Sequence, residues 1–184
     1  MDALLWAVNW SPGREALSRE SALARPDVAH YVAGWPAPGD MGLVAEAGGP
    51  IGAAWLRCFP ASDPGYGFVA EDVPELSIGV RPESRGQGVG RSLVRALLAA
   101  AAGRGVARVS LSVERANRAR QLYLAEGFRV VGGDDGADTL LVDLRPRDGH
   151  DHRLGRGRPA AVPGPGGGRA GGAGPSCPGC GGPG

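Results

Sequence analysis

The stretch that decides the fold runs from Leu76 to Leu93 and reads LSIGVRPESRGQGVGRSL. It begins like a strand, turns through a run of glycines and ends in the first turns of an apolar helix. Alternating apolar residues predict a strand over residues 75–80, and a period of three to four residues predicts a helix over residues 90–102. The apolar residues of that helix fall on one face, namely Leu93, Val94, Leu97, Leu98 and Ala101.

The glycine-rich turn Arg85–Gly90 is typical of an anion-binding site. Glycines let successive backbone N–H groups turn toward one point, and the N-terminus of the following helix adds partial positive charge. Arg85 and Arg91 flank the turn, and guanidinium groups can reach phosphate oxygens with two parallel hydrogen bonds. The alternative is a tight turn without a ligand. The preceding strand, the two arginines and the long helix favour a pyrophosphate cradle.

Two other phosphate-binding motifs fit less well. A P-loop requires Gly-Lys-Ser/Thr, and this chain contains no lysine. A dinucleotide fingerprint requires Gly-x-Gly-x-x-Gly directly after a strand, whereas here Arg91 takes the last position and four residues separate Val80 from Arg85. Glu114 lies near the place of a ribose-binding acid, so the dinucleotide interpretation stays open as the lesser alternative.

A second motif, NRARQLYLAEGF, covers Asn117–Phe128. Arg85-x-x-Gly88-x-Gly90 resembles the acyl-CoA motif of the GNAT superfamily of acetyltransferases, and the second motif resembles that family's Asn, Ala, Tyr and Gly-Phe signature. The resemblance covers residues 42–144. It implies an α/β (α+β) fold with a mixed, mostly antiparallel central sheet flanked by helices. The chain opens with a predicted helix over residues 3–8, which leaves open whether the sheet has the family's opening strand.

The resemblance also implies acetyl-CoA as co-substrate and no metal. Backbone groups of residues 78–80, in the predicted strand, would pair with the pantetheine arm of the cofactor. The amides of residues 86–91 would hold its pyrophosphate. Asn117 would hydrogen bond the pantetheine or cap its own helix. The cofactor-binding residues predicted in this way are Ile78, Gly79, Val80, Arg85, Gly86, Gln87, Gly88, Val89, Gly90, Arg91 and Asn117.

Transfer of an acetyl group to an amine needs a base for the amine and benefits from an acid for the leaving thiolate. Glu75 begins the strand that would hold the cofactor, so we predict it as the base; the alternative is a solvated carboxylate at a strand end. The loop acids Asp63, Glu71 and Asp72 are able to share or replace that role. Tyr123 is the predicted acid, and its alternative role is a core aromatic residue beside Phe128.

These residues predict an N-acetyltransferase that acts on a primary amine of a small molecule or protein. The alternative is a non-catalytic acyl-CoA-binding regulatory module. Five aromatic residues are candidates either for the acceptor pocket or for the core, namely Trp10, Trp35, Trp55, Tyr66 and Phe68.

Composition limits the remaining possibilities. The net charge of +1 provides no attraction to nucleic acid, and no apolar run is long enough to span a membrane. Three cysteines and an N-terminus without a basic start predict a cytoplasmic protein, monomeric or homodimeric. Residues 1–145 form the predicted catalytic domain, and residues 146–184, rich in Gly, Pro and Arg, a disordered tail. Its Cys177 and Cys180 supply half of a zinc site at most, so no metal is expected.

Overall fold

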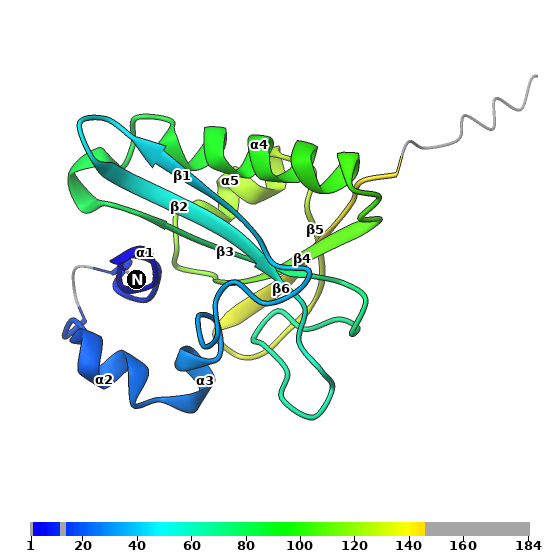
Figure 1. Cartoon of the computed structure of the whole chain (residues 1–184), viewed down its shortest axis with the longest axis horizontal. Helices are drawn as coiled ribbons and strands as arrows, with labels where there is room; N and C mark the ends of the chain where they lie inside the picture. The colour runs from blue at the N-terminus through cyan, green and yellow to red at the C-terminus, as the bar shows by residue number, and fades with distance from the viewer. Residues whose placement is uncertain (1, 12–13, 146–184) are drawn as a thin grey trace, which may run out of the picture. The chain divides into compact units, whose positions relative to one another are not determined.

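The structure is a computed structural model that describes residues 2–11 and 14–145 (Figure 1). The predicted tail over residues 146–184, with Cys177 and Cys180, lies outside the described residues.

The described part of the chain forms a six-stranded sheet in the order β1-β2-β3-β4-β6-β5. Strands β1 to β3 form an antiparallel meander, β3 and β4 are parallel, and β4, β6 and β5 are antiparallel neighbours. The prediction of a mixed, mostly antiparallel sheet is therefore confirmed. The strands are β1 Met41–Glu46, β2 Pro50–Arg57, β3 Glu75–Val80, β4 Arg108–Glu114, β5 Arg129–Gly133 and β6 Ala137–Asp143.

Helices cover both faces of this sheet (Figure 1). The N-terminal helices lie on one face and the long helix α4 on the other. The first strand of the described residues, β1, follows three helices. The helices are α1 Asp2–Val8, α2 Arg19–Leu23, α3 Pro26–Ala29, α4 Val89–Gly103 and α5 Ala119–Ala125, with a short 3₁₀ helix at Pro82–Ser84.

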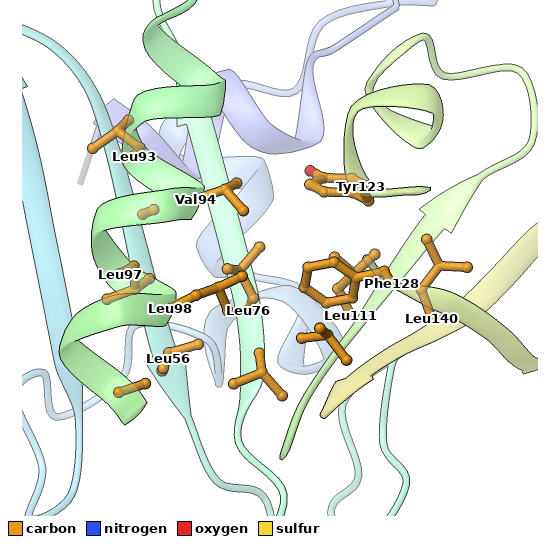
Figure 2. Close-up of a cluster of buried hydrophobic side chains, with 14 of the residues drawn as sticks. Leu56, Leu76, Leu93, Val94, Leu97, Leu98, Leu111, Tyr123, Phe128 and Leu140 are labelled. Carbon is orange, nitrogen blue, oxygen red and sulfur yellow. The ribbon is translucent and has the colours of Figure 1, made fainter. Parts of the chain in front are cut away.

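The larger core cluster lies between the sheet and α4 with α5 (Figure 2). All five apolar residues predicted on the inner face of α4 are buried. Each large aliphatic side chain buried in this way contributes about 1.5–3 kcal/mol to folding. A second cluster packs the N-terminal helices onto the opposite face and contains Leu4, Ala22, Val28, Tyr31, Trp55 and Phe59.

The sheet opens between its two central strands. β3 and β4 pair at a single position, Glu75 with Ser110. β2 pairs with the other edge of β3 from Glu75 to Val80, and β6 pairs with β4 along its whole length. The edge of β3 that faces β4 is thus left without a strand partner beyond its first residue. This opening positions the candidate site.

Helix α1 packs closely against β3 at Gly79. A Cβ atom added to Gly79 would collide with the carbonyl oxygen of Ala3 and would lie 3.0 Å from the amide nitrogen of Ala7. The helix backbone can approach the strand this closely only because residue 79 has no side chain.

Candidate active site

A cavity of about 620 Å³ lies where β3 and β4 separate, a volume within the usual range for small-molecule sites. Residues from α1, α3 and α5, from the segment after α3 and from four strands are among those that line it. Both predicted catalytic residues are among them. The lining includes Trp10, Tyr31, Trp55, Tyr66, Glu75, Ser77, Ile78, Glu114, Asn117 and Tyr123.

Glu75 is a buried carboxyl group, with only 4% of its surface exposed. Its Oε1 accepts a hydrogen bond of 2.7 Å from the Tyr31 hydroxyl. No group in the described part of the chain meets hydrogen-bonding geometry at Oε2. Burial raises the pKa of Glu75 from 4.5 to about 7, while the Tyr31 hydroxyl and, less strongly, the Gly67 amide oppose the rise. Glu75 is therefore not a solvated strand-end carboxylate, and a base with this pKa suits proton transfer near neutral pH.

Tyr31 is a site residue that the sequence did not single out. Its hydroxyl oxygen also accepts a hydrogen bond of 2.7 Å from the Tyr66 amide. In the sequence, Tyr31 lies three residues after Val28, a spacing that would place both on the same side of a helix, although α3 ends at Ala29. That spacing is a packing signal, and it carries no information on the contact with Glu75.

Tyr123 belongs both to the core and to the cavity. Its ring packs edge to face against Phe128, with 5.9 Å between ring centroids. Figure 2 shows the hydroxyl at the end of the ring that points away from Leu140. Burial raises the pKa of Tyr123 well above its usual value of 10, so the hydroxyl stays protonated at physiological pH. The two predicted roles for Tyr123 are compatible.

The three loop acids contact other groups. Asp63 lies 3.1 Å from Nδ1 of His30, Glu71 accepts a hydrogen bond of 2.8 Å from the Ala61 amide, and Asp72 lies 3.6 Å from Arg108. None of the three is among the residues that line the cavity. Of the four acids predicted as candidates for the base, only Glu75 lines the cavity.

The glycine-rich turn combines open surroundings with backbone amides that have no backbone partner. Gly86 and Gly88 have φ values of 74° and 85°, in the left-handed region that favours glycine. A Cβ atom at either position would meet nothing within 4 Å. Within the described residues, the amides from Gly86 to Arg91 donate no hydrogen bond to another backbone group, whereas the Ser92 amide bonds Gly88. These unpaired donors at the start of a 15-residue helix form a geometry that binds anions.

The two flanking arginines contact other parts of the fold. The Arg85 guanidinium donates hydrogen bonds to the carbonyl oxygens of Trp6 and Trp10 at the end of α1, at 3.1 and 3.2 Å. Arg91 pairs with Glu126 at 3.1 Å. The groups left free to bind an anion in the turn are therefore the backbone amides at the start of α4, while Arg85 and Arg91 bond to neighbouring parts of the fold.

Residues 78–80 and Asn117 lie on the two sides of the opening. Ile78, Gly79 and Val80 belong to the β3 edge that has no strand partner on the β4 side. At Gly79 the absence of a side chain is required by the close packing of α1. Asn117 Oδ1 accepts a hydrogen bond of 2.9 Å from the Ala119 amide, so Asn117 caps α5 and also lines the cavity.

The predicted acceptor aromatics divide into two groups. Trp10, Trp55 and Tyr66 line the cavity. Trp35 instead lies over the Arg57 guanidinium, with 5.5 Å between the guanidinium carbon and the ring centroid, and Phe68 packs against the second core cluster.

Glu114, the candidate ribose ligand, is already paired. It accepts hydrogen bonds from the indole of Trp10 at 3.2 Å and from Arg14 at 2.7 Å. The bond from Arg14 lowers the pKa of Glu114. The dinucleotide interpretation thus loses its acidic ligand.

The described residues contain neither a metal-binding cluster nor a helix that could span a membrane. No cluster of three His, Cys, Asp or Glu side chains arranged to hold a metal ion occurs in residues 2–11 and 14–145. No helix in the same ranges has the length and apolar character to cross a membrane.

Comparison with known proteins agrees with this geometry. The family model described as the acetyltransferase (GNAT) domain matches residues 38–130. The chain therefore belongs to the GNAT acetyltransferase family.

Individual relatives were found both by sequence and by structure. A mycothiol acetyltransferase from Thermobispora bispora is 36% identical over 95 residues, which are 51% of this chain and 31% of that protein. The chain thus spans about a third of the length of this curated relative. The GNAT domain of S. lividans PAT has a similar structure, with a TM-score of 0.55, 22% identity and 76% of each chain covered. An N-acetyltransferase from Staphylococcus aureus Mu50 has a TM-score of 0.53 at 19% identity, with 78% of this chain and 92% of that chain covered.

Proposed function

We propose that this protein is an N-acetyltransferase that moves an acetyl group from acetyl-CoA directly to a primary amine. One observation carries the proposal. Glu75, a buried carboxyl group with a pKa of about 7, and Tyr123, a protonated phenol, line the same cavity at the opening of the sheet. Family membership supports it.

The cradle and the open strand edge would hold the co-substrate. The amides from Gly86 to Arg91 and the N-terminus of α4 would bind the pyrophosphate, because both favour negative charge. Backbone groups of Ile78, Gly79 and Val80 would pair with the pantetheine arm as an added strand would. The side-chain amide of Asn117 faces the same cavity and would donate to the pantetheine.

The reaction then needs three proton transfers. Ionised Glu75 takes a proton from the acceptor ammonium, and the neutral amine attacks the thioester carbonyl carbon, which leaves the nitrogen positively charged. The C–N bond forms, the C–S bond breaks, and Tyr123 protonates the departing thiolate, whose reference pKa is about 8.5 for a simple thiol. The charged nitrogen then loses its second proton, which restores the phenol of Tyr123. The products are an N-acetyl amide and free CoA, and no covalent bond to the protein is formed.

The second candidate is a non-catalytic acyl-CoA-binding module. It would use the same cradle but would have no need for a carboxyl group poised near neutral pH beside the open strand edge. The burial of Glu75 in the cavity wall therefore favours the enzyme.

The acceptor in this proposal is an amine of a small molecule or a protein. The low, odd number of cysteines supports a cytoplasmic setting, and a monomer or homodimer is the proposed state.

Release of CoA over a panel of primary amines, measured with acetyl-CoA and purified protein, tests the function. The parent should release CoA with at least one amine. Glu75→Gln should reduce that rate by about 10²–10⁴-fold, the usual range for loss of an acid or base. Glu71→Gln is the matched control, because Glu71 lies outside the cavity and glutamine keeps an oxygen for the Ala61 amide. Binding of acetyl-CoA without CoA release for any amine would instead establish the regulatory module.

A further inference from the structure

We propose that Tyr31 is the positioning residue of Glu75, and that its hydroxyl holds the carboxyl group in one orientation and favours its ionised form. This inference rests on the proposed function, in which Glu75 is the base.

When Glu75 is ionised, the donor and the acceptor in each of the two hydrogen bonds of the Tyr31 hydroxyl are fixed. A phenol has a single proton, and a backbone amide can only donate. Because the Tyr66 amide donates to the Tyr31 oxygen at 2.7 Å, that oxygen is already an acceptor. The Tyr31 proton is then free for its other neighbour, Oε1 of ionised Glu75, at 2.7 Å. Oε1 is thereby occupied, whereas Oε2 is buried on the side of Gly65 and has no hydrogen-bond partner among the described residues.

The Tyr31 backbone is held in place from β2. The Trp55 indole donates a hydrogen bond of 3.1 Å to the Tyr31 carbonyl oxygen. The Arg57 guanidinium donates to the carbonyl oxygens of His30 and Ala33, at 2.7 and 2.8 Å, and is itself paired with the buried carboxylate of Asp40. These bonds fasten the chain on both sides of Tyr31 to a strand of the sheet.

The Tyr31 ring is fixed as well. It packs edge to face against Phe59, with 4.9 Å between centroids, and is stacked with Tyr66 at 6.2 Å. Gly65 closes the remaining side, where an added Cβ would lie 2.9 Å from the Tyr31 hydroxyl and would collide with Glu75 Oε2. A fixed ring and a fixed backbone give the phenol one orientation toward Glu75.

Within residues 2–11 and 14–145, no charged side chain contributes to the pKa shift of Glu75. Arg57 is opposite Glu75 in the strand register, but its guanidinium is bonded to Asp40. His30, next to Tyr31, faces Asp63. Across the cavity, Glu114 is bonded to Arg14, and Tyr123 is protonated. The hydrogen bond from Tyr31 is thus the main interaction that favours the ionised form of Glu75.

The test is a pH titration of the Glu75 side-chain carboxyl by ¹³C NMR, with its signal assigned by Glu75→Gln. Loss of the donor in Tyr31→Phe should raise the pKa of Glu75 by about one unit or more, because a hydrogen bond to a charged group is worth about 1.5–3 kcal/mol. The acid limb of the CoA-release rate should move to higher pH by the same amount. The rate at pH 6 should therefore fall about tenfold and recover above pH 9.

Tyr66→Phe is the matched control for the pKa of Glu75. It also removes one tyrosine hydroxyl, which contacts Asp27, but keeps the backbone amide that bonds Tyr31. The pKa of Glu75 should stay unchanged. If Tyr31→Phe does not fold, 3-fluorotyrosine at position 31 serves instead, because a more acidic phenol is a stronger donor and should lower the pKa of Glu75.

An unchanged pKa of Glu75 in folded Tyr31→Phe, or with 3-fluorotyrosine, would overturn the inference. The titration needs no acceptor, so it separates the two proposals. Failure of the parent to release CoA counts against the enzyme, while the NMR result still decides the role of Tyr31.

Discussion

Glu75 is one of the least favourably placed charged residues of the described chain. Its carboxyl group is buried, and one oxygen lacks a hydrogen-bond partner among the described residues. Ionisation in such a place costs free energy, which is why the pKa is raised to about 7. The role of base that we propose for Glu75 therefore comes at the expense of stability.

This trade-off predicts a pH-dependent stability. The unfolded protein has Glu75 near its ordinary pKa of 4.5, and the folded protein near 7. The contribution of protonated Glu75 is fully present below pH 4.5 and is lost as the pH rises through 7. Relative to the parent, Glu75→Gln should therefore gain stability between pH 5 and pH 8.5, by up to about 3 kcal/mol.

Urea denaturation of the parent and Glu75→Gln at several pH values measures this difference. Glu71→Gln, which changes an acid at the surface of the loop, should show no such trend. A constant difference between parent and Glu75→Gln across pH 5–8.5 would mean that the pKa of Glu75 is not raised in the folded state.

At the residue scale, the sequence predicts the chemistry but not the partners. Glu75 was predicted as a candidate from its position at the start of a strand, and Tyr123 from its position on a helix. Both residues line the cavity. Tyr31 lies 44 residues from Glu75, and their contact depends on β2 and on the close approach of Gly65. No local pattern encodes such a contact. For the same reason, the side-chain partners of Arg85 and Arg91 were not predictable.

The contact between α1 and β3 is the corresponding feature at the element scale. Helix α1 lies directly over Gly79, and the Arg85 guanidinium bonds two carbonyl oxygens at the end of α1 and beyond it. The helix is thus connected both to the strand and to the glycine-rich turn that follows the strand. Any side chain at Gly79 must displace α1 from the wall of the cavity.

Gly79→Ala should therefore destabilise the fold by about 1–3 kcal/mol, the usual cost of overpacking. Gly103→Ala is the control, because an added Cβ at the last residue of α4 would meet nothing within 4 Å. It should leave stability unchanged or raise it by up to about 1 kcal/mol, since alanine favours helix more than glycine does. Chemical denaturation compares the two, and equal stability of both variants would show that α1 does not pack on Gly79 as described.

Most elements were predictable from periodicity alone. Strand β3 has the bounds predicted for it, and the ends of α4 differ from the prediction by one residue each. Helix α2 was missed because its five residues are too short for a helical repeat. Its N-cap, where the Ser18 side chain accepts a hydrogen bond from the Ser21 amide, is a weak signal by itself.

At the scale of the whole described chain, the single pairing between β3 and β4 shapes the candidate site. It leaves one strand edge open, with the glycine-rich turn beyond the C-terminal end of β3 and the buried Glu75 at its start. The mixed topology follows from sequence, because hairpins precede the long helix and strand and helix alternate after it. The separation of the two central strands does not follow from sequence, since it depends on the packing of both core clusters.

The proposed function depends on binding of acetyl-CoA by the backbone amides of the turn after β3, and calorimetric titration of acetyl-CoA into two glycine variants measures this binding. Gly88→Ala and Gly105→Ala are matched, since both glycines have open surroundings and φ values of 85° and 80°. Backbone strain should therefore be similar in the two. We expect Gly88→Ala to weaken acetyl-CoA binding at least tenfold, about 1.4 kcal/mol, and Gly105→Ala to bind acetyl-CoA like the parent. Equal affinity of the parent and Gly88→Ala, or no binding by the parent, would contradict it.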